Sequence, residues 1–288
     1  MKRPKKKRKK YLYIIILIIS IYITYKYLEK KKLEINNKEL IDLVVNNSFK
    51  EEPIIHKIMY RKNNPIKLLN ESYEKVIEAN NENKPIIYLY NSHPTEEYAN
   101  QSVLEYTINP TVIMNNYILQ EIFNKKGYQT LIEENSVTDI LNNNNWNYAS
   151  SYKASRILME EAKIKNPSLK YFIDIHRDSL SRDKTTITIK EKDYAKMIFL
   201  LGLENSKYEE NLEFIEKINN KINEKYPGLS KGIYKKGGVG VNGIYNQDFS
   251  NRTILIEIGG YENNVLEVLN TSLAFSECFI EVLNEEND

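Results

Sequence analysis

The sequence predicts an α/β fold, in which a central, mostly parallel sheet is flanked by helices and preceded by an N-terminal transmembrane helix. From residue 85 onward, short apolar runs rich in Ile and Tyr alternate with longer segments of helical spacing, a pattern typical of a sheet with helices on both faces. Three of these runs end in polar side chains, and open α/β sheets usually hold their ligands at the carboxyl ends of strands. An uncharged apolar stretch near the N-terminus predicts the transmembrane helix.

The first 28 residues have the pattern of a membrane anchor. Residues 1–10 carry eight Lys or Arg and no acid, and the 15 residues 11–25 carry no charge. This run is shorter than the roughly 20 residues of a full span, but Lys26 can extend its charge to the interface and two apolar residues follow it. A cleaved signal peptide is the alternative, but no small-residue cleavage site follows. We therefore expect a single-pass anchor at 11–28, a basic cytoplasmic tail at 1–10, and an extracytoplasmic body.

Composition limits what the body can be. The net charge of +2 less the eight charges of the tail leaves −6 for residues 11–288, so we predict no nucleic-acid partner. The single cysteine, Cys278, excludes an intramolecular disulfide and a thiolate zinc cluster, and its neighbours indicate a buried helix face. Only three histidines are present. Two of them, His93 and His176, follow predicted strands, whereas His56 is interpreted as structural or exposed.

The elements follow in order along the chain. Residues 29–83 contain short amphipathic pieces and are interpreted as a juxtamembrane stalk, so that residues 84–288 form the functional domain. Apolar runs predict strands at 86–90, 128–132, 169–175, 185–189, 195–201 and 253–256. Helical spacing predicts helices at 111–126, 150–165, 212–226 and 265–283, with a loop at the asparagine run 142–146. The glycines at 237, 238 and 240 lack the lysine and helix start of a phosphate loop, which favours a turn or hairpin.

Two histidines and one carboxylate are a common ligand set for a hydrolytic zinc ion, with one position left open for water. His93 and Glu96 are three residues apart and would share a face if the chain turned helical after the first strand, with Pro94 near the first helical position. His176 could join them, because neighbouring parallel strands place equivalent ends about 5 Å apart. Other acidic residues stay open as the oxygen ligand: Glu97, Asp174 and Asp178. All of these side chains could also be ordinary surface residues.

Glu257 is the candidate for proton transfer. It is a lone charge after the run T-I-L-I, where burial without a partner would be costly. A carboxylate just outside the metal shell could accept a proton from an activated water and pass it to a leaving amine. Arg177 follows His176 directly and could hold a substrate carboxylate or form an ion pair.

Four stretches resemble the stage II sporulation protein P family: I-Y-L-Y-N-S-H-P-T-E-E-Y, Y-F-I-D-I-H-R-D-S, V-N-G-I-Y-N-Q-D-F-S and I-L-I-E-I-G-G-Y-E-N-N. Members are similar to zinc-dependent N-acetylmuramoyl-L-alanine amidases, so the resemblance implies a zinc amidase-like α/β domain over residues 84–288. It implies hydrolysis of the amide between N-acetylmuramic acid and the stem peptide of peptidoglycan, and endopeptidase activity is also described for members. It further implies septal wall remodelling and engulfment during sporulation, alongside stage II sporulation proteins D and M.

The resemblance also assigns residues. It implies that His93, Glu96 and His176 bind the zinc ion and that Glu257 is the catalytic carboxylate. The candidate substrate-binding residues are Arg177, Asn246 and Gln247. The chain departs from the family at Asn91, where members often carry a further histidine. Two other functions stay open, namely a wall-binding scaffold with a vestigial metal site and a metallopeptidase that acts only on stem peptides.

Overall fold

The computed structural model describes residues 84–99, 101–103, 106–108 and 110–287. The predicted tail (1–10), anchor (11–28) and stalk (29–83) lie outside these residues, so these three assignments stay predictions. No helix in the described part of the chain is long and apolar enough to cross a membrane.

Within the described residues, six strands form one sheet in the order β4-β1-β5-β10-β8-β9. Their bounds in this order are Thr130–Ile132, Ile87–Tyr90, Tyr171–Asp178, Thr253–Gly260, Met197–Gly202 and Ser230–Lys236. The first four strands run parallel, β8 runs antiparallel to β10, and β9 runs parallel to β8. The predicted mostly parallel sheet is therefore confirmed. Because β1, β5 and β10 are parallel neighbours, their carboxyl ends lie at one edge of the sheet.

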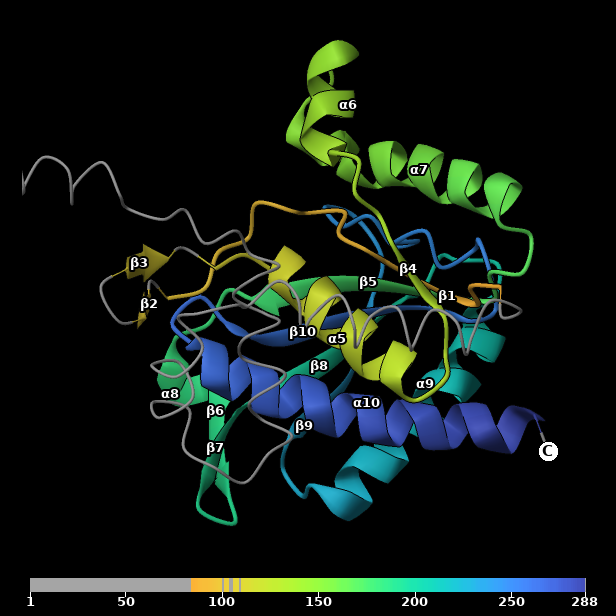
Figure 1. The fold of residues 1–288 in the computed structure, drawn as a ribbon. Helices are drawn as coiled ribbons and strands as arrows, with labels where there is room; N and C mark the ends of the chain where they lie inside the picture. Colours follow the sequence, from red (N-terminus) through yellow and green to blue (C-terminus); the bar gives the residue numbers. More distant parts are fainter. Residues whose placement is uncertain (1–83, 100, 104–105, 109, 288) are drawn as a thin grey trace, which may run out of the picture. The chain divides into compact units, whose positions relative to one another are not determined.

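Each face of the sheet has its own core, because side chains alternate between the faces. Leu89 and Ile173 belong to the larger core, which includes buried residues of three helices, whereas Tyr88 and Phe172 pack with α7 on the other face. The helices of the larger core are α5 Ile113–Lys125, α9 Tyr208–Lys225 and α10 Val265–Asn287; the opposite helix is α7 Ser151–Lys165. Figure 1 shows these three helices on one side of the sheet and α7 on the other.

The predicted helices all form, for the reasons expected. In α9 the buried Phe214, Ile215, Ile218 and Ile222 recur at helical spacing, which gives the helix one apolar face. Cys278 is fully buried on α10, as its neighbours indicated. After α5 the chain passes through Gly127 with φ of +89°, a left-handed conformation that glycine adopts at little cost.

The remaining elements are short, and the sequence predicted them less well. They are β2 Gln101–Val103, β3 Tyr106–Ile108, α6 Val137–Asn143, the 3-10 helix Tyr148–Ser150, α8 Arg182–Thr185, β6 Thr186–Ile189 and β7 Lys192–Ala195. The strand predicted at 185–189 forms β6, but it pairs with β7 in a separate hairpin. The edge strand β9 was not predicted, because the second half of this strand is exposed and lacks an apolar run. The glycines after β9 form a turn, as predicted.

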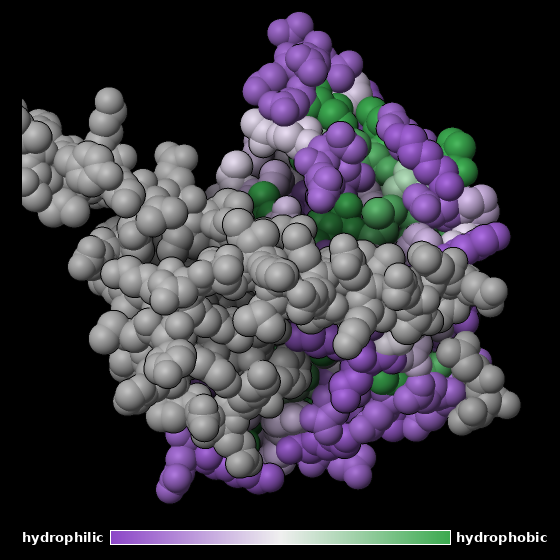
Figure 2. All heavy atoms as spheres, viewed as in Figure 1, coloured by the Kyte–Doolittle hydropathy of each residue, from purple (hydrophilic) through white to green (hydrophobic). Residues whose placement is uncertain are grey.

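On the face shown in Figure 2, hydrophilic residues cover much of α7, and hydrophobic residues are visible in a hollow beneath it. A cavity of about 320 Å³ lies between α7 and the segment of β4, lined among others by Leu131, Leu158 and Glu161. None of the candidate zinc ligands lines this cavity.

Two strands continue further than the sequence predicted. β5 extends to Asp178 and β10 to Gly260, so that His176 and Glu257 lie within strands and not after them. At these carboxyl ends, one face turns polar while Ile175 and Ile258 still fill the larger core on the other face. In the sequence, the continuous apolar run stops where one face becomes polar, so the pattern indicates a strand end there although the strand continues.

Candidate metal centre

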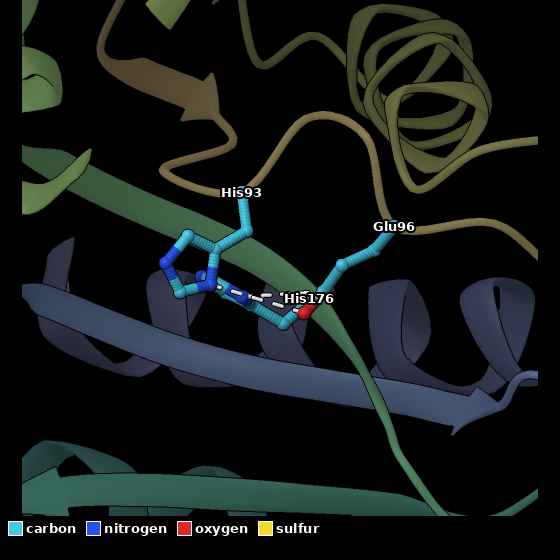
Figure 3. Close-up of side chains that lie close together, drawn as sticks. All are labelled: His93, Glu96 and His176. Atoms are coloured by element: carbon cyan, nitrogen blue, oxygen red, sulfur yellow. Dashed lines mark ion pairs between the residues drawn. The ribbon is translucent and has the colours of Figure 1, made fainter. Parts of the chain in front are cut away.

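Two segments meet at the carboxyl edge of the sheet on the α7 face. His93 and Glu96 come from the turn that follows β1, and His176 comes from β5 beneath it, as Figure 3 shows. His93 Nδ1 lies 3.8 Å from Glu96 Oε1, and His176 Nδ1 lies 3.5 Å from Glu96 Oε2. The two imidazole rings cross nearly at right angles, with centroids 4.9 Å apart. The sequence therefore predicted correctly that these three side chains converge.

These donors fit a zinc ion. The three residues can each offer one ligand atom, and those atoms lie within 4.8 Å of one another. Ligand atoms held tetrahedrally at about 2.0–2.2 Å from zinc are about 3.3–3.6 Å apart, and His176 Nδ1 lies 3.5 Å from Glu96 Oε2. Two imidazoles and a carboxylate also match the chemistry of catalytic zinc sites.

The local backbone differs from the prediction. Residues 91–97 form bends and turns and not the start of a helix, so the expected shared helix face of His93 and Glu96 is wrong. A turn achieves the same approach, since Glu96 N donates to His93 O at 3.3 Å. The Glu96 carboxylate is then oriented from β5, because Arg177 N donates to its Oε2 at 3.0 Å.

The ring of His176 is oriented by Asp174 and Ser92. His176 Nε2 lies 3.0 Å from Asp174 Oδ1 and 3.0 Å from Ser92 Oγ. Ser92 also donates to both Asp174 oxygens, through its hydroxyl at 2.7 Å and its backbone N at 2.9 Å. With Nε2 held by the buried carboxylate, Nδ1 faces Glu96, which is the arrangement of a metal-binding histidine supported by a second carboxylate.

The electrostatics of the centre favour a positive charge between the ligands. Burial alone would lower the pKa of His176, but Asp174 and Glu96 outweigh it and raise this pKa to about 10. Burial and the neighbouring His176 lower the pKa of His93. Burial would raise the pKa of Glu96, yet hydrogen bonds from His176 and from Arg177 N lower it. Glu96 thus stays ionised, and a divalent cation could replace the proton on His176.

Glu257 lies beside these residues. It pairs with His176 in the ladder between β10 and β5, so both side chains leave the sheet on the same face. Burial, and then the negative charge of Asp178, raise the pKa of Glu257 from 4.5 to about 7. A carboxyl group with this pKa can both accept and release a proton near neutral pH.

The other predicted residues serve different contacts. Glu97 is exposed and lies outside the ligand group, and Asp178 accepts a hydrogen bond from Lys231 Nζ at 2.8 Å. Arg177 Nε donates a hydrogen bond to the Glu97 carbonyl at 2.7 Å, and this bond holds the turn that carries His93 and Glu96 against β5. Of the open oxygen ligands, Glu96 is therefore the one that the structure groups with the two histidines.

Asn246 and Gln247 have their amide groups engaged within the chain. Gln247 is fully buried, accepts from Gly202 N at 2.8 Å and donates to Leu200 O at 2.7 Å. Asn246 Nδ2 donates to Tyr152 O at 2.9 Å. Both residues thus join the loop before β10 to its neighbours, and their positions give no support to a role in substrate binding.

Sequence reasoning overlooked three residues of the centre. Ser92 stands directly before His93, and its position could have drawn attention to it. Tyr148 lies in the 3-10 helix that precedes α7, and Tyr152 lies in the first turn of α7. Their rings lie 4.7 and 5.3 Å from the His93 ring, Tyr148 in a stacked arrangement. No signal in the sequence links these tyrosines to a turn some 55 residues earlier, because only the fold brings the segments together.

Comparison with known proteins agrees with the resemblance seen in the sequence. A model of the family described as stage II sporulation protein P matches residues 8–280. The chain belongs to this family. The stage II sporulation protein P of Bacillus subtilis (strain 168) is 34% identical over 207 residues, which are 69% of this chain and 51% of that protein. The chain therefore spans about half the length of this curated member of the family.

Two solved structures are similar at a lower level. The N-acetylmuramoyl-L-alanine amidase AmiC2 of Nostoc punctiforme gives a TM-score of 0.40 at 10% identity, covering 69% of this chain and 97% of that one. The CwlD amidase from Clostridioides difficile, in complex with the GerS lipoprotein, gives 0.43 at 13% identity, covering 70% and 100%.

Proposed function

We propose that this chain is a membrane-anchored, zinc-dependent N-acetylmuramoyl-L-alanine amidase. Its substrate would be the amide between N-acetylmuramic acid and the stem peptide of peptidoglycan. The observation that carries the proposal is the meeting of His93, Glu96 and His176 from two segments, with Glu257 paired to His176 on the same face of the sheet. Membership of the stage II sporulation protein P family supports an action in septal wall remodelling and engulfment.

The residues of the centre would divide the reaction between them. His93, Glu96 and His176 would hold the zinc ion, which when bound lowers the pKa of water and polarises the scissile carbonyl. The Glu257 carboxylate would accept a proton from the water that attacks this carbonyl. It would then return the proton to the amide nitrogen as the C–N bond breaks, so that the stem peptide leaves as a neutral amine. A pKa near 7 suits both steps, because the group must gain and lose the proton in one turnover.

The direct test is product analysis. Purified protein supplied with zinc should release stem peptides with free amino termini from isolated cell walls, and mass spectrometry would identify them. Glu96→Ala and Glu257→Ala should lose this release, whereas Glu97→Ala, which alters an exposed neighbour, should keep it. Wild-type protein that binds zinc but frees no stem peptide would contradict the amidase assignment.

The same products separate the alternatives. Fragments cut within the stem peptide and still attached to glycan would indicate a metallopeptidase, and both kinds of product would indicate an additional endopeptidase activity. Sedimentation with walls without any cleavage would indicate a binding scaffold.

We also propose that the domain lies outside the cytoplasm, held by a single span, and acts with stage II sporulation proteins D and M. Protease treatment of intact protoplasts should remove the domain and leave only the N-terminal part protected. Co-purification from sporulating cells would test the partners.

A further inference from the structure

The turn that carries two of the ligands is tied to the strand that carries the third. Asn91 is buried, and its Nδ2 donates to the carbonyl of Ile175, the residue before His176, at 2.7 Å. β1 pairs with β5 only as far as Tyr90. One residue further, the Asn91 side chain takes over the hydrogen bonding that the backbone of β1 no longer provides.

The other end of the turn is tied to the strand of the proposed base. The Tyr98 hydroxyl is buried and donates at 2.7 Å to the carbonyl of Ile258, the residue after Glu257. The pairing of β10 with β5 is interrupted between Glu257 and Gly260. Tyr98 therefore holds the β5 side of β10 at the point where that ladder is interrupted, while Ile258 stays paired with Met197 of β8.

Two consecutive asparagines in the first turns of α5 support these contacts. Asn116 Nδ2 donates to Asn91 Oδ1 at 2.6 Å, and Asn115 Nδ2 donates to the Tyr98 hydroxyl at 2.8 Å. Both asparagines are buried. Consecutive helical residues point about 100° apart, so one asparagine can reach each end of the turn.

We propose that Asn115 and Asn116 are positioning residues that set two separate properties of the centre. Asn116 orients Asn91, which holds β5 at Ile175, next to His176. Asn116 therefore controls how well the three ligands fit the metal. Asn115 acts through Tyr98 on the strand position of Glu257, so it controls proton transfer once the metal is bound. This inference rests on the proposed zinc amidase function.

The test separates metal binding from turnover. Full-length protein in detergent would be titrated with zinc against a chromophoric chelator, and its turnover on cell walls would be measured at saturating zinc. Asn116→Ala should weaken zinc binding about 10-fold, the lower end of what outer-shell changes cause, and regain most of its turnover when zinc saturates. Asn115→Ala should reduce turnover about 10-fold at saturating zinc while zinc affinity stays near the wild-type value. Tyr98→Phe, which keeps the ring and removes only the hydroxyl, should behave as Asn115→Ala does.

A matched control exists in α9. Asn211 is also fully buried, and its Nδ2 donates to the carbonyls of Ser250 and Thr253 at the opposite end of β10. Asn211→Ala should lower the thermal unfolding temperature and leave zinc affinity and turnover at saturating zinc unchanged.

The results distinguish this inference from the proposed function. Wild-type protein that neither binds zinc nor releases stem peptides would overturn both. If the wild-type protein binds zinc and releases stem peptides, two outcomes would overturn only the separate roles. In the first, Asn115→Ala and Asn116→Ala behave like Asn211→Ala. In the second, each variant loses zinc affinity and turnover in equal measure.

Discussion

Replacing Glu257 with glutamine should abolish hydrolysis and at the same time stabilise the metal-free protein above neutral pH. Burial and the charge of Asp178 raise the pKa of Glu257 from 4.5 to about 7, which means that the folded state disfavours its ionised form. Each pKa unit corresponds to about 1.36 kcal/mol. The rise of the Glu257 pKa from 4.5 to about 7 therefore means that the ionised carboxylate lowers the free energy of unfolding by about 3 kcal/mol. Glutamine has a similar shape without the charge, so it should recover part of this amount.

The sign of this effect fixes its pH dependence. Between pH 4.5 and about 7 the folded protein binds more protons at Glu257 than the unfolded chain does, so stability falls as the pH rises through this window. Below pH 4.5 both states are protonated and the penalty is absent. The stability difference between Glu257→Gln and wild type should therefore be near zero at pH 4.5 and reach its full value by about pH 8.

Urea unfolding of residues 84–288 with a chelator present, at several pH values, would measure this difference. Titrating groups that do not interact with Glu257 are common to both proteins and cancel in the comparison. Glu97→Gln is the control, because its exposed side chain should change stability little at any pH. A Glu257→Gln protein no more stable than wild type at pH 8, or equally stabilised at pH 4.5, would refute the reasoning.

Three further predictions concern the surroundings of the centre. Zinc at 100 times its Kd should raise the free energy of unfolding of the wild type by about 2.7 kcal/mol, and Glu96→Gln should lose most of this gain in the same titration. Gly260→Ala should destabilise the protein by about 1–3 kcal/mol, measured by denaturant unfolding, because the new Cβ would lie 2.0 Å from Leu180 O. Tyr148→Ala should weaken zinc binding several-fold by removing the ring stacked 4.7 Å from that of His93, whereas Tyr148→Phe should bind zinc like the wild type in a chelator competition.

The sequence predicted the sheet because its central strands are buried on both faces. In β1 and β8 every residue is buried, so these strands read as continuous apolar runs between turn residues. The edge strand β9 is half exposed and carries three lysines, which suits an unpaired edge but hides the strand from a search for apolar residues. β6 has the composition of a strand, yet nothing local specifies that it pairs with β7 and not with the main sheet.

The candidate ligands were predictable because each follows or lies in a recognisable strand, but their geometry was not. The approach of Glu96 to His93 depends on a turn and on a carboxylate that is held from outside the turn, by Arg177 N. The selection of Glu96 over Asp174 depends on Ser92, which engages Asp174 with two hydrogen bonds. Such contacts join residues more than 80 positions apart, and no local pattern in one sequence reveals them.

Charge balance at the centre favours a working metal site over a vestigial one in a binding scaffold. Glu96, Asp174 and Glu257 gather around His93 and His176, and Asp174 and His176 are almost fully buried. Concentrating carboxylates away from water destabilises a fold unless a cation compensates them. Replacing buried ion pairs with well-packed apolar side chains is often neutral or stabilising, so a scaffold would not need this cluster for its stability. Glu257 is the carboxylate whose ionised form the folded protein disfavours. Strain of this kind is typical of sites that perform chemistry, and a divalent ion between the ligands would offset it.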